Sequence, residues 1–229
     1  MYIPEHIIQR NILKSLSKEE ICRFRDLKPK DIESNLFLYH LRQLIKHKIV
    51  EKTVTGRYSL SVVGRQYVDR SNLPTMKPRL QPKQLTILII EAPDDKLIIL
   101  KRLHVPYLGY RGLPSGKIHY GEGISEAATR ELLEKTGLDD IKLTLRGNVL
   151  MRFCDPKTKE VISHINAYIH TGKTEITELD FKTEYFVSYI ANKTELFQKK
   201  SFEGHKEIME CLTKHKSYFF KEFTFESLY

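Results

Sequence analysis

A short stretch near the middle of the chain combines glutamates, an arginine and a glycine at spacings that suit metal and phosphate chemistry. Gly116 is followed after five residues by Glu122, then after seven more by Arg130 and Glu131, with Glu134 three positions further on. Glu131 and Glu134 would share one face of a helix, one turn apart. Such carboxylates supply the oxygen ligands that a hard cation such as Mg²⁺ prefers, and this cation commonly bridges substrate phosphates.

Residues beside these carboxylates are candidates for holding phosphate groups and for supporting the ligands. The glycine at position 116 lets the backbone come close to a metal ion and to phosphates. Arg130 would orient a neighbouring carboxylate. The expected metal ligands are Glu131, Glu134, Gly116 and Glu122, and the expected catalytic residues are Glu131, Glu134 and Arg130. The candidates for binding phosphate or ligand are Ser115, Gly116, Lys117 and Arg111.

An amphipathic helix over residues 124–136 is predicted to carry these glutamates, started by Gly123 and stopped by Gly137. Its apolar flank consists of Ala127, Ala128, Leu132 and Leu133. Lys135 lies four residues beyond Glu131 and faces the same way. A third carboxylate at position 135 would complete an oxygen-rich face, so the lysine is the one residue that does not suit a cation site.

Lys135 changes the charge of this face by two units, because it replaces a negative charge with a positive one. At ~4–6 Å and an effective dielectric constant of about 20, each unit charge is worth several kcal/mol against metal binding. A flexible lysine can also swing outward, so the substitution handicaps the site without abolishing it. A simpler interpretation is an ordinary helix ion pair between Glu131 and Lys135, worth ~0.2–0.5 kcal/mol.

The whole stretch from Gly116 to Leu138, GKIHYGEGISEAATRELLEKTGL, resembles the Nudix box, G-x5-E-x7-R-E-U-x-E-E-x-G-U, in which U is an aliphatic residue. The one departure is Lys135, where the family pattern has the second glutamate of a Glu-Glu pair. The resemblance implies an α/β/α sandwich and Mg²⁺-dependent cleavage of nucleoside diphosphate derivatives, with Glu131 or Glu134 as base for the attacking water. Because of Lys135, we expect weakened Mg²⁺ binding and weak or no hydrolysis.

Further elements of such a domain are indicated on both sides of the box. Strands are predicted over residues 84–91, 96–103, 142–153, 161–170 and 184–190, and a helix over residues 203–214. Nudix enzymes commonly take another carboxylate from a loop beyond the box, for which Glu195 and Glu203 are open alternatives. The family often has a tryptophan near the position of Arg111, whereas this chain has no Trp. This difference indicates an altered ligand pocket.

Length and composition favour a two-domain cytoplasmic protein. The 229 residues are 41% hydrophobic, which is enough for one or two cores. No apolar run is long enough to span a bilayer, and the N-terminus shows no apolar signal-peptide segment. The three scattered cysteines, Cys22, Cys154 and Cys211, offer no disulfide framework and fit a reducing compartment. We therefore expect a cytoplasmic protein without a membrane partner.

The net charge of +9 is confined to the first third of the chain. Residues 1–83 contain 17 Lys and Arg against 8 Asp and Glu, whereas residues 84–229 contain 21 of each kind. A localised basic excess is typical of nucleic-acid-binding domains. The plainer alternative is a soluble basic face that has no nucleic-acid partner.

The N-terminal third is predicted to be a small helical domain with one hairpin. The expected elements, in order, are helices over residues 5–16, 18–24 and 34–48, a hairpin of strands 49–54 and 57–60, and a closing helix over residues 62–70. Ser34 or Asn35 can cap the third helix, and Ser61 can cap the last one. Gly56 lies in the hairpin turn.

This order of elements resembles a winged helix-turn-helix domain, and the segments YHLRQLIKHKIVEK and GRYSLSVVG are similar to those of small bacterial and archaeal repressors. The resemblance implies that the third helix enters the major groove of double-stranded DNA and that the hairpin touches the backbone or minor groove. The candidate DNA-binding residues are Asn35, Tyr39, Arg42, Gln43, Lys46, Lys52 and Arg57. Because some winged helices bind proteins instead, an assembly role without nucleic acid stays open.

The predicted organisation is a winged helix domain at residues 1–70, a proline-containing linker at 71–83 and a Nudix α/β domain at 84–229. This combination resembles Nudix-related transcriptional regulators, in some of which the box is degenerate. It implies a DNA-binding regulator that senses a nucleotide-type small molecule. A homodimer is expected because operators are usually pseudo-palindromic. The alternative is an active Mg²⁺-dependent Nudix hydrolase in which the N-terminal domain is a targeting module.

Overall fold

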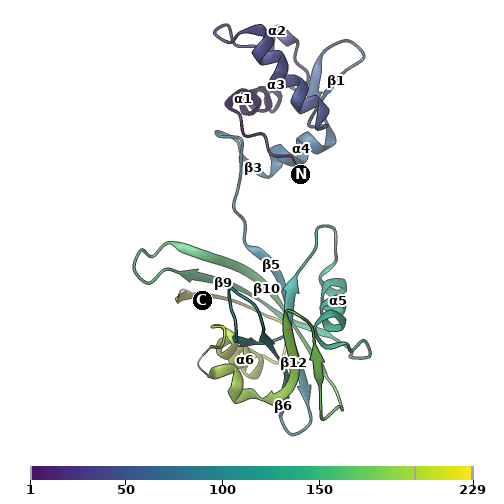
Figure 1. Ribbon diagram of the computed structural model, residues 1–229, viewed down its shortest axis with the longest axis vertical. Helices are drawn as coiled ribbons and strands as arrows, with labels where there is room; N and C mark the ends of the chain where they lie inside the picture. Colours follow the sequence, from purple (N-terminus) through teal and green to yellow (C-terminus); the bar gives the residue numbers. More distant parts are fainter. Residues whose placement is uncertain (1, 199, 228–229) are drawn as a thin grey trace. The chain divides into compact units, whose positions relative to one another are not determined.

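The chain forms two compact units, Met1–Leu80 and Gln81–Tyr229. The computed structural model describes residues 2–198 and 200–227 of the chain (Figure 1). Each unit has its own buried apolar cluster, as two separate domains require. None of the helices in the described ranges is long and apolar enough to cross a lipid bilayer.

The N-terminal unit consists of helices around one hairpin. Its helices are α1 (Ile7–Leu16), α2 (Phe24–Leu27), α3 (Ser34–Lys46) and α4 (Val62–Asp69), and its strands are β1 (Val50–Lys52), β2 (Tyr58–Leu60), β3 (Ser71–Asn72) and β4 (Lys77–Pro78). Strands β1 and β2 pair in antiparallel fashion, as do β3 and β4. Apolar residues at helical spacing on α1 and α3 meet in the core, among them Ile12, Leu13, Phe37, Leu41 and Leu44.

The ends of two helices show which caps the sequence uses. The Ser61 hydroxyl accepts a hydrogen bond from the Gly64 N–H at 3.0 Å, which confirms the predicted cap of α4. Helix α3 is capped by Glu33, whose carboxylate accepts the Asn35 N–H at 3.2 Å. The predicted caps Ser34 and Asn35 were therefore wrong, because Ser34 is already the first helical residue.

The second helix lies later in the chain than the predicted residues 18–24. It begins at Phe24 and ends at Leu27. Cys22 is extended instead, because its N–H donates to the Tyr58 carbonyl and its carbonyl accepts from the Tyr58 N–H, each at 2.9 Å. This pairing with a strand 36 residues away outweighs the local helical tendency of the segment.

The predicted linker at residues 71–83 is shorter in the structure, because its first part belongs to the N-terminal unit. The β3–β4 hairpin folds back so that Met76 is only 1% exposed in the core of that unit. The Tyr67 hydroxyl donates to the Met76 carbonyl at 2.9 Å. The boundary between the units therefore falls after Leu80.

The C-terminal unit is built on a nine-stranded mixed sheet with the order β11-β12-β6-β5-β10-β9-β13, to which β7 and β8 add beside β6 and β5. The strands are β5 (Lys83–Ala92), β6 (Lys96–Arg102), β7 (Arg111–Gly112), β8 (Ser115–Lys117), β9 (Thr144–Cys154), β10 (Val161–Lys173), β11 (Asp180–Lys182), β12 (Phe186–Asn192) and β13 (Phe219–Glu226). The pairs β5–β10 and β9–β13 are parallel, and the other pairs are antiparallel.

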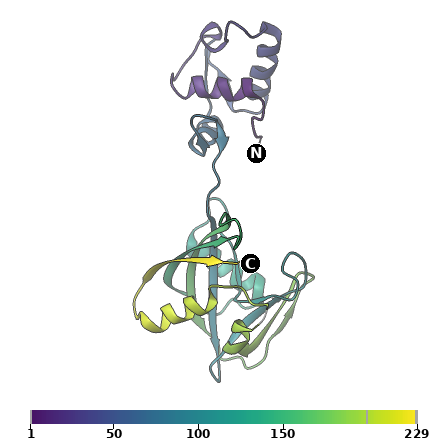
Figure 2. The same ribbon diagram turned by 90° about the vertical axis from the view of Figure 1, so that its left-hand side faces the viewer.

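Helices α5 (Ile124–Thr136) and α6 (His205–Lys214) cover opposite faces of this sheet, and the short 3-10 helix η1 (Lys193–Phe197) follows β12 (Figures 1 and 2). Alternate residues of β5 point to opposite sides, so Leu88 and Ile90 pack with Leu132 of α5, while Ile87 and Ile89 pack with Ile208 of α6. The predicted mixed α/β fold of this unit is confirmed.

Candidate metal and ligand site

Helix α5 positions the predicted carboxylates, and its observed bounds are the predicted residues 124–136. At its start, the Glu126 carboxylate accepts the Gly123 N–H at 2.8 Å. At its end, Gly137 adopts the left-handed conformation with φ 74°, and its N–H donates to the Leu133 carbonyl at 2.8 Å. Both glycines therefore act as the sequence predicted, and the helix presents Arg130 on its polar side.

Gly116 lies where the carboxylate of Glu131 meets the backbone of β8. It pairs with Thr86 of β5, so the position of this backbone is fixed by the sheet. A Cβ atom at residue 116 would lie 1.8 Å from the Glu131 Oε1, a distance that no side chain can adopt. The glycine therefore lets the Glu131 carboxylate lie against the backbone of β8, while the predicted approach of a metal ion and phosphates to this backbone stays a prediction.

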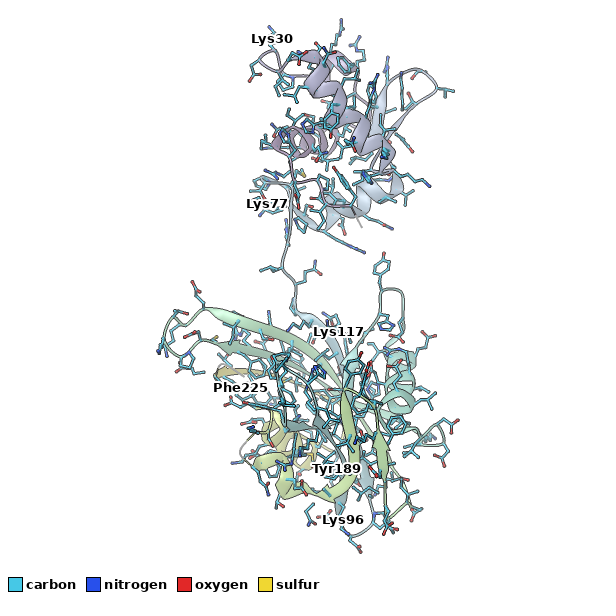
Figure 3. The ribbon with its side chains drawn as sticks, in the orientation of Figure 1. Lys30, Lys77, Lys96, Lys117, Tyr189 and Phe225 are labelled. Atoms are coloured by element: carbon cyan, nitrogen blue, oxygen red, sulfur yellow. The ribbon has the colours of Figure 1, made fainter. Side chains whose placement is uncertain are left out.

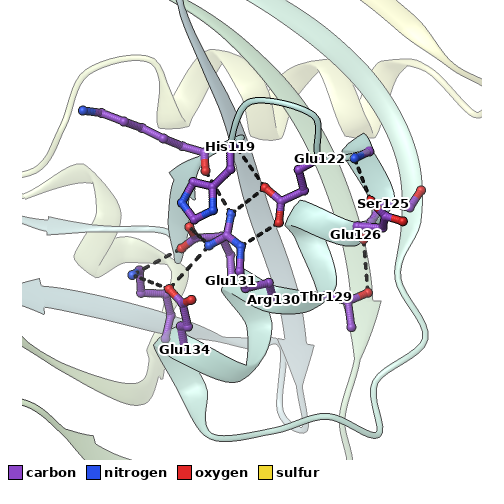
Figure 4. A network of polar contacts seen from close by, with 11 residues as sticks. His119, Glu122, Ser125, Glu126, Thr129, Arg130, Glu131 and Glu134 are labelled. Atoms are coloured by element: carbon purple, nitrogen blue, oxygen red, sulfur yellow. Dashed lines mark hydrogen bonds and ion pairs between the residues drawn. The ribbon is translucent and has the colours of Figure 1, made fainter. Parts of the chain in front are cut away.

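Arg130 is the centre of a charged network that brings the three predicted carboxylates together (Figure 4). Its Nε and Nη2 donate to the two oxygens of Glu122 at 2.7 and 2.9 Å, a bidentate pair. Its Nη1 donates to Glu131 Oε1 at 2.7 Å and lies 3.5 Å from Glu134 Oε2. Its Nη2 also donates to the Lys117 carbonyl at 3.0 Å, which ties α5 to β8.

Glu122 is held in its ionised form by this network. The hydrogen bonds from Arg130 and from the His119 N–H, the latter at 2.8 Å, lower the pKa of Glu122 to about 2. The hydrogen bonds that Arg130 donates to Glu122 and Glu131 raise the pKa of Arg130 above its usual range. In this arrangement both carboxylate oxygens of Glu122 are therefore engaged by the Arg130 guanidinium.

Lys135 occupies the space beside the other two carboxylates. Its Nζ lies 3.2 Å from Glu131 Oε2 and 3.8 Å from Glu134 Oε2, and its side chain is only 21% exposed. The ammonium also lies 5.2 Å from the centre of the Phe186 ring. The Lys135 side chain therefore turns inward. Its positive charge lies where Glu131 and Glu134 would otherwise attract a metal ion.

The residues of this site do not fit Mg²⁺ as they are arranged. Glu131 is buried, one of its oxygens accepts from Arg130, and the other faces the Lys135 ammonium. A divalent cation would have to displace the Lys135 ammonium, and its two positive charges would then lie close to the charge of the lysine. In the ranges that the structure describes, no three His, Cys, Asp or Glu side chains gather closely enough to hold a metal ion.

The four predicted ligand-binding residues do not all lie together. Ser115 and Lys135 line a cavity of about 270 Å³, whereas Lys117 is exposed on β8. Arg111 is not among the lining residues, although its neighbour Gly112 is. The Arg111 Nε lies 3.3 Å from Glu195 Oε2 and donates to the Tyr189 hydroxyl, also at 3.3 Å (Tyr189 is labelled in Figure 3). Glu195, one of the two further carboxylates considered from the sequence, is therefore the partner of Arg111.

Sequence reasoning missed most of the residues that line this cavity. They are Arg102, His104, Tyr185, Phe186 and Phe202, together with apolar residues of β6 and the segment before β8. These residues come from three separated parts of the chain and form no motif. Only the strand order, which places β12 beside β6, brings Arg102 and Phe186 together.

The candidate DNA-binding residues lie on the solvent side of the N-terminal unit. Helical spacing places Asn35, Tyr39, Arg42, Gln43 and Lys46 on one stripe of α3, opposite the buried Phe37, Leu41 and Leu44. Four of these five stripe residues are exposed, and Gln43 is half-buried. Lys52 and Arg57 are exposed on the β1–β2 hairpin, whose turn contains Gly56 with φ 75°.

Comparison with known proteins matches the C-terminal unit to an established family. A curated relative, an ADP-ribose pyrophosphatase from Methanocaldococcus jannaschii, is 33% identical over 90 residues, which are 37% of this chain and 53% of the relative. The chain thus spans about half the length of that relative.

Two solved structures share the fold of this unit at low sequence identity. A MutT protein from Bacillus halodurans has a TM-score of 0.51 at 21% identity, covering 62% of this chain and 89% of that chain. The NUDIX domain of Shewanella oneidensis NrtR complexed with ADP ribose has a TM-score of 0.50 at 15% identity, covering 66% of this chain and 96% of that chain. The NUDIX domain model matches residues 82–212, more than half of the sequence, and the chain belongs to the NUDIX domain family.

Proposed function

We propose that the protein is a DNA-binding transcriptional regulator whose NUDIX unit senses a nucleotide-type metabolite. The observation that carries this proposal is the inward position of Lys135, 3.2 Å from Glu131 and 3.8 Å from Glu134. An ammonium there opposes the binding of a catalytic cation, while the neighbouring cavity stays available to a ligand. A site that binds but hardly cleaves its ligand suits a sensor better than an enzyme.

The N-terminal unit supports the DNA-binding part of the proposal. Its order of three helices, a hairpin and a fourth helix resembles a winged helix-turn-helix, and the whole charge excess of the chain lies in residues 1–83. The exposed stripe of α3 carries arginine, asparagine and glutamine, whose side chains can contact base edges, together with a lysine that suits phosphate. A homodimer would match the two half-sites of a pseudo-palindromic operator.

ADP-ribose is the first ligand to test. The curated relative is named an ADP-ribose pyrophosphatase, and one solved structure with the same fold is a complex with ADP ribose. Both proteins therefore point to a nucleotide with a diphosphate. This class fits a cavity that combines cationic side chains with aromatic rings.

The DNA-binding proposal can be tested by selecting duplexes from a random pool with the full chain and measuring affinity by fluorescence anisotropy. We expect a selected duplex to bind more tightly than unselected DNA, with an affinity that falls steeply between ~50 and ~200 mM salt. The double variant Arg42→Ala/Gln43→Ala should lose the preference for the selected duplex, whereas Arg65→Ala, an exposed change on α4, should keep it. Absence of binding even at low salt would support a role in assembly instead.

An active Mg²⁺-dependent hydrolase is the second candidate, because Glu122, Arg130, Glu131 and Glu134 are all present and connected. Hydrolysis of a panel of nucleoside diphosphate derivatives by the natural chain and by Lys135→Glu separates the two candidates. We expect the natural chain to be slow or inert and the variant to gain activity with Mg²⁺. Rapid turnover by the natural chain would make it an enzyme with an appended N-terminal unit.

A further inference from the structure

The cavity beside α5 has the composition of an anion-binding pocket with aromatic walls. Its volume is about 270 Å³, and its lining includes two cationic residues, Arg102 and Lys135, and three aromatic ones, Tyr185, Phe186 and Phe202. The lining contains no carboxylate. An anion in this cavity would interact favourably with the charge of Arg102.

Arg102 lacks the acidic partner that a half-buried guanidinium usually has. Its Nε is buried and makes no hydrogen bond, and no carboxylate lies within 4.0 Å of it in residues 2–198 and 200–227. Its Nη2 contacts His104 Nε2 at 3.1 Å, and the guanidinium lies 5.3 Å from the centre of the Tyr107 ring. These contacts fix the orientation of the Arg102 guanidinium but do not neutralise its charge. The guanidinium is therefore free to bind a phosphate group.

Lys135 of helix α5 lines the same cavity. Its charge is partly balanced by Glu131 and Glu134, which also hold the ammonium in one place. In this position the ammonium lies 5.2 Å from the centre of the ring of Phe186, which also lines the cavity. Glu131 and Glu134 therefore pair with the Lys135 ammonium, whereas the family pattern places carboxylates there that bind a metal ion.

We propose that Arg102 and Lys135 together bind the diphosphate of a nucleoside diphosphate derivative without any divalent cation. The inference rests on the proposed sensing function and names its ligand chemistry. The aromatic walls offer a surface on which a ring of the ligand stacks. The volume is close to the lower end of ligand pockets, ~300–1,000 Å³, and suits a diphosphate with one adjoining ring.

The decisive experiment is isothermal titration calorimetry of the full chain with ADP-ribose, ADP, AMP and adenosine, each with excess EDTA and each with Mg²⁺. We expect ADP-ribose and ADP to bind with Kd values that agree within about threefold in the two buffers, and AMP and adenosine to bind at least ~10-fold more weakly. The variant Lys135→Glu should bind the diphosphates only when Mg²⁺ is present, because it restores a third carboxylate.

Variants of the two cations test their roles directly. Arg102→Gln and Lys135→Gln keep most of the side-chain length and should each weaken ADP-ribose binding by ~10-fold or more in EDTA. The matched controls Arg152→Gln and Lys142→Gln change exposed residues outside the cavity and should leave the Kd unchanged. Circular dichroism shows whether each variant is folded, and Arg102→Lys, which keeps the charge, should restore part of the affinity if Arg102→Gln is destabilised.

Two results would overturn the inference. Tightening of ADP-ribose binding by ~10-fold or more with Mg²⁺ would show that a metal carries the phosphates, while ligand sensing itself would stand. Unchanged binding in folded Arg102→Gln and Lys135→Gln would show that Lys135 is only the counterion of its helix neighbours. If none of the four compounds binds in either buffer, both this inference and the proposed sensing of such nucleotides fail.

Discussion

At the scale of single residues, Gly116 is the position where the site tolerates least change. Its backbone is fixed by pairing with Thr86, and the carboxylate of Glu131 fills the space where a side chain would begin. We predict that Gly116→Ala destabilises the C-terminal unit by about 1–3 kcal/mol, because the buried carboxylate or the strand must move.

Hydrogen–deuterium exchange of the peptides that cover β8 and α5 measures this loss of stability in the C-terminal unit alone. Gly123→Ala is the matched control, since a Cβ there would lie 3.2 Å from the flexible end of Glu126 and the backbone φ is −73°. The control should cost less than about 1 kcal/mol. Equal exchange rates in Gly116→Ala and the natural chain would contradict the close contact with Glu131.

Glu122 makes stability depend on pH in a definite direction. Its pKa is lowered in the folded protein from 4.5 to about 2, so the folded state prefers the ionised form. The resulting stabilisation is fully present above pH 4.5 and is lost as the pH falls from there to about 2. Glu122→Gln should therefore remove part of the acid sensitivity of the C-terminal unit.

Urea unfolding midpoints, followed by circular dichroism at several pH values between about 5 and 2.5, check this prediction. The difference between the natural chain and Glu122→Gln should shrink as the pH falls. Asp180→Asn, an exposed change on β11, serves as the control that should keep the natural pH dependence. A constant difference over this range would mean that the Arg130 pair does not shift the pKa of Glu122.

At the scale of elements, the β3–β4 hairpin decides where the N-terminal unit ends. Met76 is 1% exposed and packs in that unit's core, whereas Leu80 is fully exposed only four residues later. We predict that Met76→Ala destabilises the N-terminal unit by about 2–5 kcal/mol, because it leaves a cavity in the core. Leu80→Ala, which also shortens an apolar side chain, should change stability by less than about 0.5 kcal/mol.

Hydrogen–deuterium exchange of α1 and α3 peptides distinguishes these outcomes for Met76 and Leu80, because it reports on the N-terminal unit separately. Faster exchange in Met76→Ala than in Leu80→Ala is expected. Similar rates in the two variants would mean that residues 71–78 are a linker, as the prolines had indicated.

The elements that could be predicted from the sequence are those with strong local signals. Helix α5 has a glycine at each end and a spaced motif, and its observed bounds equal the predicted ones. Helix α2 and the β3–β4 hairpin could not be predicted, because Cys22 pairs with distant Tyr58 and Met76 packs into a core formed elsewhere. The cavity lined by Arg102 and Phe186 could not be predicted for the same reason, since these residues meet only through the pairing of β6 with β12.

At the scale of the whole molecule, the proposed regulator would use the two units for different tasks, DNA binding and ligand sensing. The basic excess lies in residues 1–83, while residues 84–229 carry equal numbers of acidic and basic side chains. Nonspecific attraction to DNA should therefore come from the N-terminal unit, and the NUDIX unit should contribute little to the salt dependence. A ligand in the NUDIX unit can affect DNA binding only if it favours one of two states of the whole protein.

Coupling between ligand binding and DNA binding best distinguishes a regulator from an enzyme with an additional N-terminal unit. If ADP-ribose changes the affinity of the full chain for its selected duplex by a given factor, the duplex must change the affinity for ADP-ribose by the same factor, typically ~5–150-fold. Anisotropy with and without ADP-ribose and calorimetry with and without DNA measure the two factors independently. Arg102→Gln should raise the ADP-ribose concentration needed for the effect on DNA by ~10-fold or more. It should leave the DNA affinity without ligand intact, because the change lies in the NUDIX unit. If neither ligand changes the affinity for the other, the two units act independently and the proposed regulatory function fails.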